Sequence, residues 1–323
     1  MKAYVLGADG PSIVDIAQPK PTGAQLLVRI RAACLNRADL GVASGRMNGH
    51  RGGVGSTLGG EGAGEVVEVG PDVKGIKVGD RVMGSISGAF AEYGLMDHGR
   101  AFAIPANNMT YEQAASLPVA LNTMHNAVVT AGALEPGQTV LIQGASSGVG
   151  LMAMQIAKLM GASFVIGTST DASRRARLHE CGADLAVDSS AHGWVDQVLK
   201  ATNGVGVDLI VDQVSGKLAS ENLRATKIEG RIVNVGRLGG MHADFDFDLH
   251  ALRRIKYIGV TFRTRTLEEI RAIADGVRRD LWQGVTSGKL SLPIDKVFPL
   301  AEADDAYAYM AANRHFGKIA LRM

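Results

Sequence analysis

The stretch from Val140 to Ala162, VLIQGASSGVGLMAMQIAKLMGA, constrains the fold more than any other part of the chain. A short apolar run reaches a loop with glycines at 144, 148 and 150, and a helical pattern follows until Gly161. A second strand pattern, SFVIGTS, comes directly after the helix. The order strand, glycine turn, helix and strand predicts the start of a βαβ unit in a parallel sheet.

Strands and helices keep alternating after this unit. ASRRARLHECGAD predicts a helix that stops at Gly182, and GVDLIVDQV and GRIVNVG predict two buried strands with the helical segment GKLASENLRATK between them. Strands that alternate with helices of this length indicate a doubly wound parallel sheet with right-handed crossovers. We therefore predict a Rossmann-type α/β domain over residues 118–261.

The two ends of the chain follow a different pattern. Short strand patterns such as QLLVRIRAACL and GEGAGEVVEVG are separated by glycine turns and predict a small mixed β domain. After Phe262, TLEEIRAIADGVRRDLWQGVTSGKL predicts one long helix with a Thr-x-x-Glu start, and IDKVF and GKIALRM predict strands around a short helix. We predict that residues 262–323 return to residues 1–117 and complete a discontinuous, mostly β domain.

The glycine loop predicts a dinucleotide site. Glycines at these positions let backbone N–H groups approach a pyrophosphate at a helix N-terminus. The strand before the loop, the helix after it and the second strand about twenty residues on are the context that the motif requires. A purely structural glycine turn is the alternative. The expected contacts of the loop are Ser146, Ser147, Gly148 and Val149.

Composition limits the class of protein. Apolar residues make up 46% and charged residues 20% of the chain, which is typical of a globular protein with a large core. A net charge of +2 without a basic stripe argues against nucleic acid as a partner. Two cysteines without a CxxC pair exclude a disulfide framework and a cysteine-rich zinc site. The sequence shows neither a signal peptide nor a spanning apolar run, so we expect a cytoplasmic protein without membrane partners.

The motif GASSGVG occurs in two families of nicotinamide enzymes. In the short-chain dehydrogenases the loop lies near the N-terminus and accompanies a Tyr-x-x-x-Lys pair. None of the six tyrosines here has a lysine four residues further on, and the loop begins at Gly144. The short-chain interpretation therefore fails.

The chain resembles the medium-chain dehydrogenase/reductase superfamily, and within it the zinc-independent quinone oxidoreductases. The resemblance rests on CLNRAD, LGGEGAGEVVEVGPDVKGIKVGDRVMG, GAFAEY, QAASLPVALNTMHNAV, PGQTVLIQGASSGVG, VFPLAEADDAYAYM and HFGKIAL, in the family's order. It implies a GroES-like catalytic domain joined to a Rossmann domain. It also implies a homodimer that forms through the edge strand IKYIGVTF.

The resemblance also implies that the family's catalytic zinc is absent. Asn36 stands where zinc-using members have a cysteine, and Gly60 stands where they have a histidine. A catalytic zinc needs about three protein ligands, and the chain's histidines show no metal-like spacing. Without a Lewis acid, a simple ketone is hard to polarise, whereas quinones and conjugated enones accept hydride readily.

The end of the second strand predicts the cofactor. NAD enzymes carry an acidic residue there, but this chain has Thr168, with Arg174, Arg175 and Arg177 close behind. A guanidinium suits a 2′-phosphate, and the resemblance places that role on Arg174. Alternatively, these arginines form the solvated face of a helix. We therefore predict NADPH, with Thr168, Thr170, Arg174 and Ser189 as contacts.

The resemblance implies the remaining site residues. Asn36 and Thr123 match positions near the nicotinamide and are the candidate catalytic residues. Further cofactor contacts are expected at Gly236, Arg237, Leu238, Phe262, Arg263 and Lys318. Three alternatives stay open. Lys318 could be a surface lysine, Asp39 could only stabilise its turn, and Cys34 could be an inert buried thiol.

Substrate contacts are less well defined. Two tyrosines that such reductases often carry are Gly41 and Met47 here. Arg46, His50 and Arg51 could bind an acidic or phosphate-bearing substrate, or could belong to a solvated glycine-rich loop.

Together these features predict NADPH-dependent, metal-free reduction of a small-molecule quinone or α,β-unsaturated carbonyl. One alternative is a reductase of 2-enoyl thioesters or haloacrylates. Another, of a different class, is a crystallin-like or nucleic-acid-binding protein that retains the cofactor.

Overall fold

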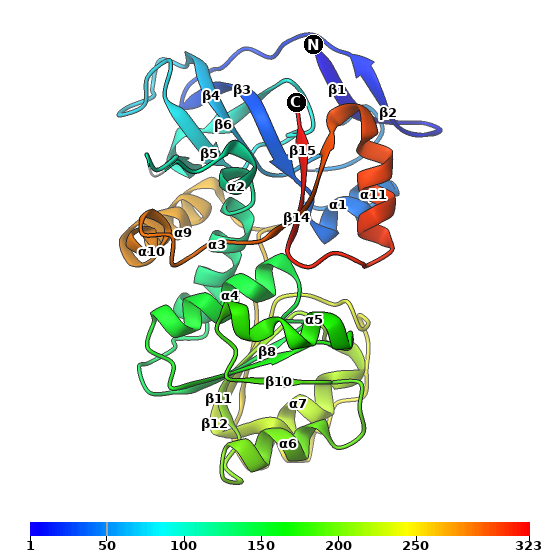
Figure 1. Ribbon diagram of the computed structural model, residues 1–323, viewed down its shortest axis with the longest axis vertical. Helices are drawn as coiled ribbons and strands as arrows, with labels where there is room; N and C mark the ends of the chain where they lie inside the picture. The colour runs from blue at the N-terminus through cyan, green and yellow to red at the C-terminus, as the bar shows by residue number, and fades with distance from the viewer. Residues whose placement is uncertain (50, 107) are drawn as a thin grey trace. The chain divides into compact units, whose positions relative to one another are not determined.

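The computed structural model describes residues 1–49, 51–106 and 108–323 (Figure 1). His50, one residue of the predicted basic loop, lies outside the described residues. The chain divides into two compact units. Unit 1 comprises Met1–Ala120, Phe262–Thr286 and Ser291–Met323, and unit 2 comprises Leu121–Thr261 and Ser287–Leu290.

Unit 2 contains a six-stranded sheet in which every pair is parallel. Its strand order is β10-β9-β8-β11-β12-β13, so the chain winds outward from β8 in one direction and then from β11 in the other. The strands are β8 (Thr139–Gln143), β9 (Phe164–Thr168), β10 (Leu185–Val187), β11 (Val207–Asp212), β12 (Thr226–Asn234) and β13 (Lys256–Gly259). The predicted doubly wound parallel sheet is confirmed.

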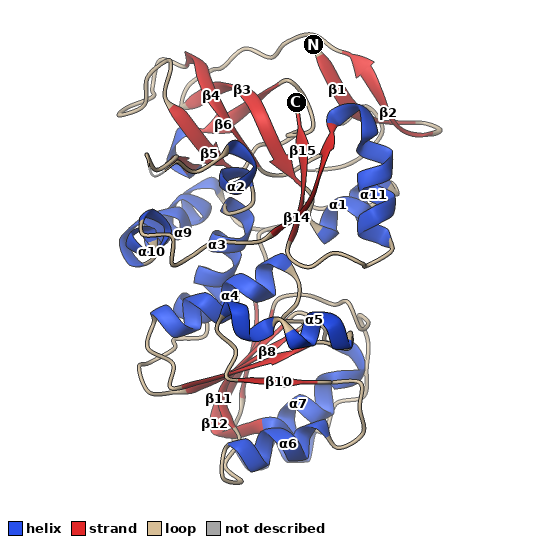
Figure 2. Ribbon diagram, in the orientation of Figure 1, coloured by secondary structure: helices blue, strands red, loops and turns tan. Residues whose placement is uncertain are grey.

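Helices cover both sides of this sheet (Figure 2). Helix α4 contacts β8 and β9, whereas α7 and α8 contact β12. The helices are α4 (Gly148–Leu159), α5 (Ala172–Ala176), α6 (Trp194–Ala201), α7 (Ala219–Ala225) and α8 (Phe247–Arg253), with the π-helix η2 (His125–Thr130) and the short 3-10 helices η3 (Leu178–Cys181) and η4 (Gly216–Leu218). The predicted helix after Thr170 is broken into α5 and η3, and it ends as expected at Gly182, whose φ is 97°.

Unit 1 contains a seven-stranded sheet and a two-stranded β1-β2 hairpin. The larger sheet has the order β14-β15-β3-β4-β5-β7, and β6 also pairs with β3. The strands are β1 (Lys2–Gly7), β2 (Gly10–Asp15), β3 (Gln25–Cys34), β4 (Gly62–Val69), β5 (Arg81–Gly84), β6 (Tyr93–Asp97), β7 (Ala101–Ala103), β14 (Ile294–Pro299) and β15 (Lys318–Arg322). Because β15 pairs antiparallel with β3, the C-terminal segment completes the sheet that the N-terminal segment begins.

The helices of unit 1 differ from the prediction in one place. They are α1 (Arg37–Ala43), α2 (Tyr111–Ala115), α3 (Pro118–Met124, which continues into unit 2), α9 (Leu267–Asp280), α10 (Trp282–Thr286) and α11 (Ala303–Ala311), with turns η1 (His98–Arg100) and η5 (Leu300–Glu302). Thr266 caps α9 with Glu269 in the expected capping box. The single long helix predicted here is wrong: the chain leaves α9 at buried Leu281, and Trp282 then stacks on Phe102 at 5.3 Å.

No helix among the described residues is both long enough and apolar enough to cross a membrane.

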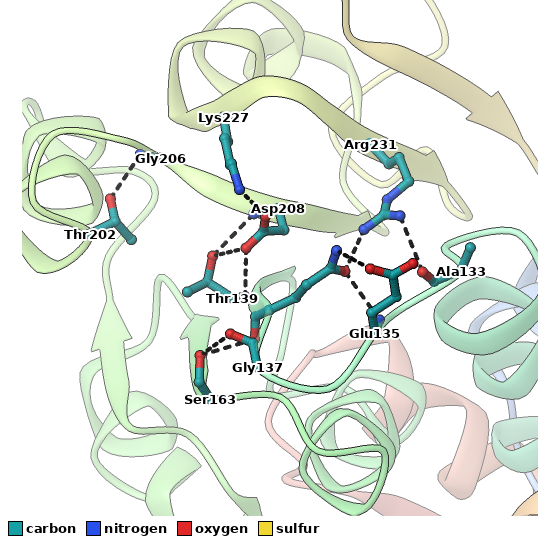
Figure 3. Close-up of polar contacts among 11 residues, drawn as sticks. Ala133, Glu135, Gly137, Thr139, Ser163, Thr202, Gly206, Asp208, Lys227 and Arg231 are labelled. Carbon is teal, nitrogen blue, oxygen red and sulfur yellow. Dashed lines mark hydrogen bonds and ion pairs between the residues drawn. The ribbon is translucent and has the colours of Figure 1, made fainter.

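The amino ends of β8 and β11 are joined by a polar cluster (Figure 3). Asp208 Oδ2 accepts hydrogen bonds of 2.9 Å from both the backbone N–H and the hydroxyl of Thr139, and Lys227 donates to Oδ1 at 2.8 Å. Burial alone would raise the pKa of Asp208, but the bonds from Lys227 and Thr139 hold this pKa below its usual value. The cluster lies at the end of the sheet opposite the glycine loop, so we assign it to stability.

Replacing Asp208 with alanine is expected to lower the free energy of unfolding by about 2 kcal/mol at pH 7, because charge-assisted hydrogen bonds are lost. The difference from the wild type should shrink below about pH 4, since a depressed folded-state pKa stabilises only above the unfolded value. Thermal and urea unfolding measure both effects. Lys227→Ala is the control: its side chain is 46% exposed, and its loss should cost at most about 1 kcal/mol. Equal effects of the two substitutions would contradict this assignment.

Candidate active site

Three polar side chains of unit 1 meet where three segments of the main sheet come together. Asn36 follows β3, Glu61 precedes β4, and Lys318 opens β15. Lys318 Nζ lies 2.6 Å from Glu61 Oε1 and donates to Asn36 Oδ1 at 2.9 Å. Asn36 Nδ2 donates to the same Glu61 oxygen at 2.8 Å. The three residues therefore form a closed hydrogen-bonded ring, which we call the Asn36–Glu61–Lys318 triad.

The triad is buried. The Glu61 side chain is 0% exposed and that of Lys318 is 4% exposed, so the alternative that Lys318 is a surface lysine is wrong. Burial raises the pKa of Glu61. Burial by itself would lower the pKa of Lys318, but the attraction of Glu61 outweighs it, and this pKa is raised. The second Glu61 oxygen accepts a 2.8 Å bond from Val119 N, so both carboxylate oxygens have partners.

The turn after β3 presents Asn36. Asp39, in the first turn of α1, accepts a 2.8 Å bond from the backbone N–H of Asn36 through Oδ2. Its other oxygen binds Arg51 Nη2 at 2.6 Å. Asp39 therefore does stabilise this turn, and it also fixes Arg51. Nearby Cys34 is 0% exposed, and burial raises the pKa of its thiol far above the usual range, in agreement with an inert buried cysteine.

The glycine loop of unit 2 has the geometry of an anion site. Ser147 caps α4 by accepting a 3.1 Å bond from Gly150 N. A side chain at Gly150 would lie 2.6 Å from the carbonyl oxygen of Gly144, so the turn admits only glycine there. Within the described part of the chain, the N–H groups of Gly148 and Val149 have no partner at the start of this helix of 12 residues. This arrangement fits the pyrophosphate of a dinucleotide.

A buried polar chain supports the loop from below. Thr168 accepts a 3.1 Å bond from Gly144 N and donates to Gln143 Oε1 at 2.8 Å. Gln143 then donates to Asn222 at 2.8 Å, and Asn222 donates to Asp212 at 3.0 Å. Thr168 is 0% exposed, so our prediction of a direct cofactor contact there needs correction: the threonine positions the loop instead.

The structure distinguishes the three predicted arginines from one another. Arg175 Nη1 donates to Ser169 O at 2.9 Å and to Asp188 at 3.1 Å, and Arg177 pairs with Glu180 at 3.1 Å. Both side chains therefore serve the local structure. Arg174 lies in α5, with its Nε 3.7 Å from Asp171 Oδ1. Asp171 is the N-cap of α5 and accepts a 2.8 Å bond from Arg174 N, which explains the acidic residue beside the expected phosphate site.

The remaining predicted residues fall into both units. In unit 2, Thr170 is exposed and Ser189 is buried just beyond β10, Gly236 to Leu238 follow β12, and Thr123 is a partly exposed residue of α3. In unit 1, Phe262 is partly buried and Arg263 is exposed. Gly49 of the glycine-rich loop lies close to Arg263: a Cβ at Gly49 would lie 3.1 Å from the carbonyl oxygen of Arg263, a tight contact.

Comparison with known proteins identifies the family. Residues 22–106 match the Alcohol dehydrogenase GroES-like domain, and residues 148–276 match the Zinc-binding dehydrogenase family. The chain belongs to the medium-chain dehydrogenase/reductase superfamily. The predicted placement with the zinc-independent quinone oxidoreductases of this superfamily is confirmed.

Three superfamily members illustrate the range of relatives. The chain is 28% identical over 316 residues to Quinone oxidoreductase-like protein 2 of Bos taurus, covering 97% of this chain and 89% of that protein. It is 30% identical over 313 residues to a phenolphthiocerol/phthiocerol polyketide synthase of Mycobacterium tuberculosis, covering 97% of this chain but only 14% of the synthase. Mycobacterial Rv1454c, solved in complex with NADPH, aligns over 100% of both chains at 27% identity with a TM-score of 0.87.

The zinc ligands of the superfamily do not fit the residues of this chain. The Asn36 amide is bound at both ends, and the Lys318 ammonium beside it would repel a metal cation. The space for a side chain at Gly60 is taken, since a Cβ there would lie 2.9 Å from Arg51 Cζ. No group of three or more His, Cys, Asp or Glu among the described residues could hold a metal ion.

Sequence reasoning missed several of these groups. Glu61 lies within LGGEGAGEVVEVG but has no role in the prediction from sequence, and neither do Gln143 and Asn222. A polar residue at the end of the apolar run VLIQ was the available signal for Gln143. The pairing of Glu61 with Lys318 has a sequence separation of 257 and leaves no local signal.

Breaking the buried pair is expected to destabilise the protein strongly. Glu61→Leu or Lys318→Met alone should each cost about 3–5 kcal/mol, because either leaves an unpaired buried charge. The double variant should cost clearly less than the sum of the two. Urea unfolding of all four proteins measures the coupling. Arg322→Ala is the control, because it breaks an ion pair whose arginine is 64% exposed. Additive effects would show that Glu61 and Lys318 do not stabilise each other.

Proposed function

We propose that this protein is an NADPH-dependent, metal-free reductase of quinones or α,β-unsaturated carbonyls. The observation that carries the proposal is the Asn36–Glu61–Lys318 triad, which stands where zinc-using members of the superfamily bind their metal. The bovine quinone oxidoreductase-like relative and the NADPH complex of mycobacterial Rv1454c support it.

The chain supplies binding and orientation in this proposal. A bound nicotinamide supplies the hydride. The N–H groups of Gly148 and Val149 hold the pyrophosphate, and Ser146, Ser147, Thr170, Ser189 and residues 236–238 complete the cofactor site. Phe262, Arg263 and Thr123 are proposed to lie near the nicotinamide.

Asn36 is the proposed group at the reacting end. Its carbonyl oxygen accepts from Lys318, and one of its two N–H bonds is donated to Glu61. One N–H remains for the acceptor or the nicotinamide amide. Because both ends of the amide are held, its orientation is fixed before any ligand arrives. The Lys318 ammonium already binds Asn36 and Glu61, so we assign the final proton to water.

The electrostatics favour activated acceptors. A hydrogen-bond donor stabilises the negative charge that develops on the acceptor less strongly than a divalent metal does. The acceptor must therefore delocalise that charge itself. Quinones and enones meet this requirement, because hydride addition gives a phenolate or an enolate. Simple alcohols and ketones do not.

A second candidate is a reductase of 2-enoyl thioesters, to which the haloacrylate alternative is chemically related. It is favoured by the match of nearly the whole chain to one stretch of the mycobacterial polyketide synthase. The acceptor is again a conjugated carbonyl, so the same site would serve both.

A panel of acceptors tests the proposal. With NADPH, 1,4-benzoquinone, a simple enone, crotonyl-CoA and an unactivated ketone should be compared at equal concentration. We expect turnover of the quinone or the enone and none of the ketone. Faster reduction of crotonyl-CoA would favour the thioester alternative. Binding of NADPH without turnover of any acceptor would favour a cofactor-retaining protein of another class.

Arg174→Ala is expected to raise the KM for NADPH by about 10- to 100-fold, because a charge-assisted contact to the 2′-phosphate is worth about 1.5–3 kcal/mol. The KM for NADH should stay within about twofold, since NADH lacks that phosphate. Arg177→Ala is the matched control, because this neighbouring arginine pairs with Glu180. Initial rates with each cofactor measure the effect. Comparable loss with NADH and NADPH would reject Arg174 as the phosphate contact.

We also propose that the homodimer forms through β13, the outer strand of the unit 2 sheet. Its ladder is paired on one side only, by β12, and Tyr257 is 37% exposed.

A further inference from the structure

The guanidinium of Arg51 lies in the space that a side chain at position 60 would take, because residue 60 is a glycine. A Cβ at Gly60 would lie 2.9 Å from Arg51 Cζ and 3.1 Å from Nη2, so a side chain there would force the guanidinium to move. Position 60 is the one where zinc-using members of the superfamily carry a histidine ligand. In this chain a guanidinium therefore lies where that imidazole would begin.

A buried carboxylate holds the guanidinium. Nη2 binds Asp39 Oδ1 at 2.6 Å, and the Asp39 side chain is only 1% exposed. The other Asp39 oxygen accepts from the backbone N–H of Asn36, so one buried carboxylate fixes both Arg51 and the turn that presents Asn36. The backbone adds a second restraint, since Arg51 and Asn48 exchange hydrogen bonds of 3.2 and 2.8 Å.

Arg51 is also the accessible member of this cluster of charges. Its side chain is 28% exposed, whereas those of Asp39, Glu61 and Lys318 are 4% exposed or less. Asp39 engages one of its terminal nitrogens. Arginine presents five N–H donors in a planar fork, so donors remain for a ligand. Arg46, on the same loop, is exposed and its side chain has no partner among the described residues, which agrees with a solvated position.

We propose that Arg51 is a catalytic residue whose guanidinium binds the carbonyl oxygen of the acceptor and stabilises the negative charge that forms there. This inference rests on the proposed function and deepens it. The hydride brings two electrons to the electrophilic carbon, and the π electrons of the conjugated system move to the carbonyl oxygen. NADPH becomes NADP⁺, and water supplies the proton that completes the reduced product. Arg51 contributes only hydrogen-bond donors and transfers no proton.

A merely structural role for the Arg51–Asp39 pair is the competing explanation, and kinetics separate the two. Arg51→Gln and Arg51→Ala should lower kcat by about 10²–10³-fold, the effect of removing one oxyanion donor. The KM for NADPH should change by less than about twofold. Arg46→Gln, on the same loop, should leave kcat unchanged.

Chemical rescue of the activity of Arg51→Ala separates the two explanations, because added guanidinium would not restore a lost structural contact. Millimolar guanidinium chloride should restore part of the activity of Arg51→Ala, and urea at the same concentration should not. Gly60→Ala tests the same site with Arg51 intact, because the added methyl group must displace the guanidinium; it should lower kcat and leave NADPH binding unchanged. If Arg51→Ala fails to fold, Gly60→Ala carries the test.

Binding of an oxyanion probe separates this inference from the proposed function. 4-Nitrophenolate should bind the wild type without cofactor, and Arg51→Gln should weaken that binding at least tenfold. Wild-type protein that binds the phenolate through Arg51 but reduces no acceptor would overturn the proposed function alone. Active wild-type protein whose Arg51→Gln and Gly60→Ala variants keep kcat within threefold would overturn the role of Arg51.

Discussion

The buried contact between Lys318 and Glu61 is the interaction on which the architecture of unit 1 depends. Taking a carboxylate and an ammonium out of water costs several kcal/mol for each ion, and only close mutual contact offsets the cost. Glu61 lies directly before β4, Lys318 opens β15, and the pair is closed by the amide that follows β3. The two charges can be satisfied only when these strands have joined in register. The cluster thus selects one arrangement of segments that are far apart in the sequence.

Unit 2 uses the same principle with neutral groups. The polar chain from Thr168 through Gln143 and Asn222 to Asp212 crosses the carboxyl ends of β9, β8 and β11. These are the strands around the point where the winding of the sheet reverses, and ligands of such sheets bind at that point. A buried polar chain is stable only when every member has a partner. It therefore fixes the conformation of the glycine loop, while the N–H groups of Gly148 and Val149 stay available for a ligand.

Local patterns in the sequence predicted what local geometry determines. The glycine loop, the alternation of strands and helices, the capping box at Thr266 and the stop at Gly182 each depend on residues within one or two turns. The positions that failed depend on distant partners. Thr168 stands where a cofactor contact is expected, yet its hydroxyl bonds to Gln143, a residue of the neighbouring strand. The burial of Lys318 depends on Glu61, and the position of Arg51 depends on the absence of a side chain at Gly60.

Glycine in place of histidine at position 60 makes positions 60 and 51 depend on each other, although they would look independent in a sequence comparison. A histidine at position 60 would overlap the guanidinium of Arg51 where it now lies, so the guanidinium would have to move to make room for it. Moving the guanidinium would separate it from Asp39, which would then be a buried carboxylate without its cation. A histidine at position 60 would therefore call for a compensating change at Asp39.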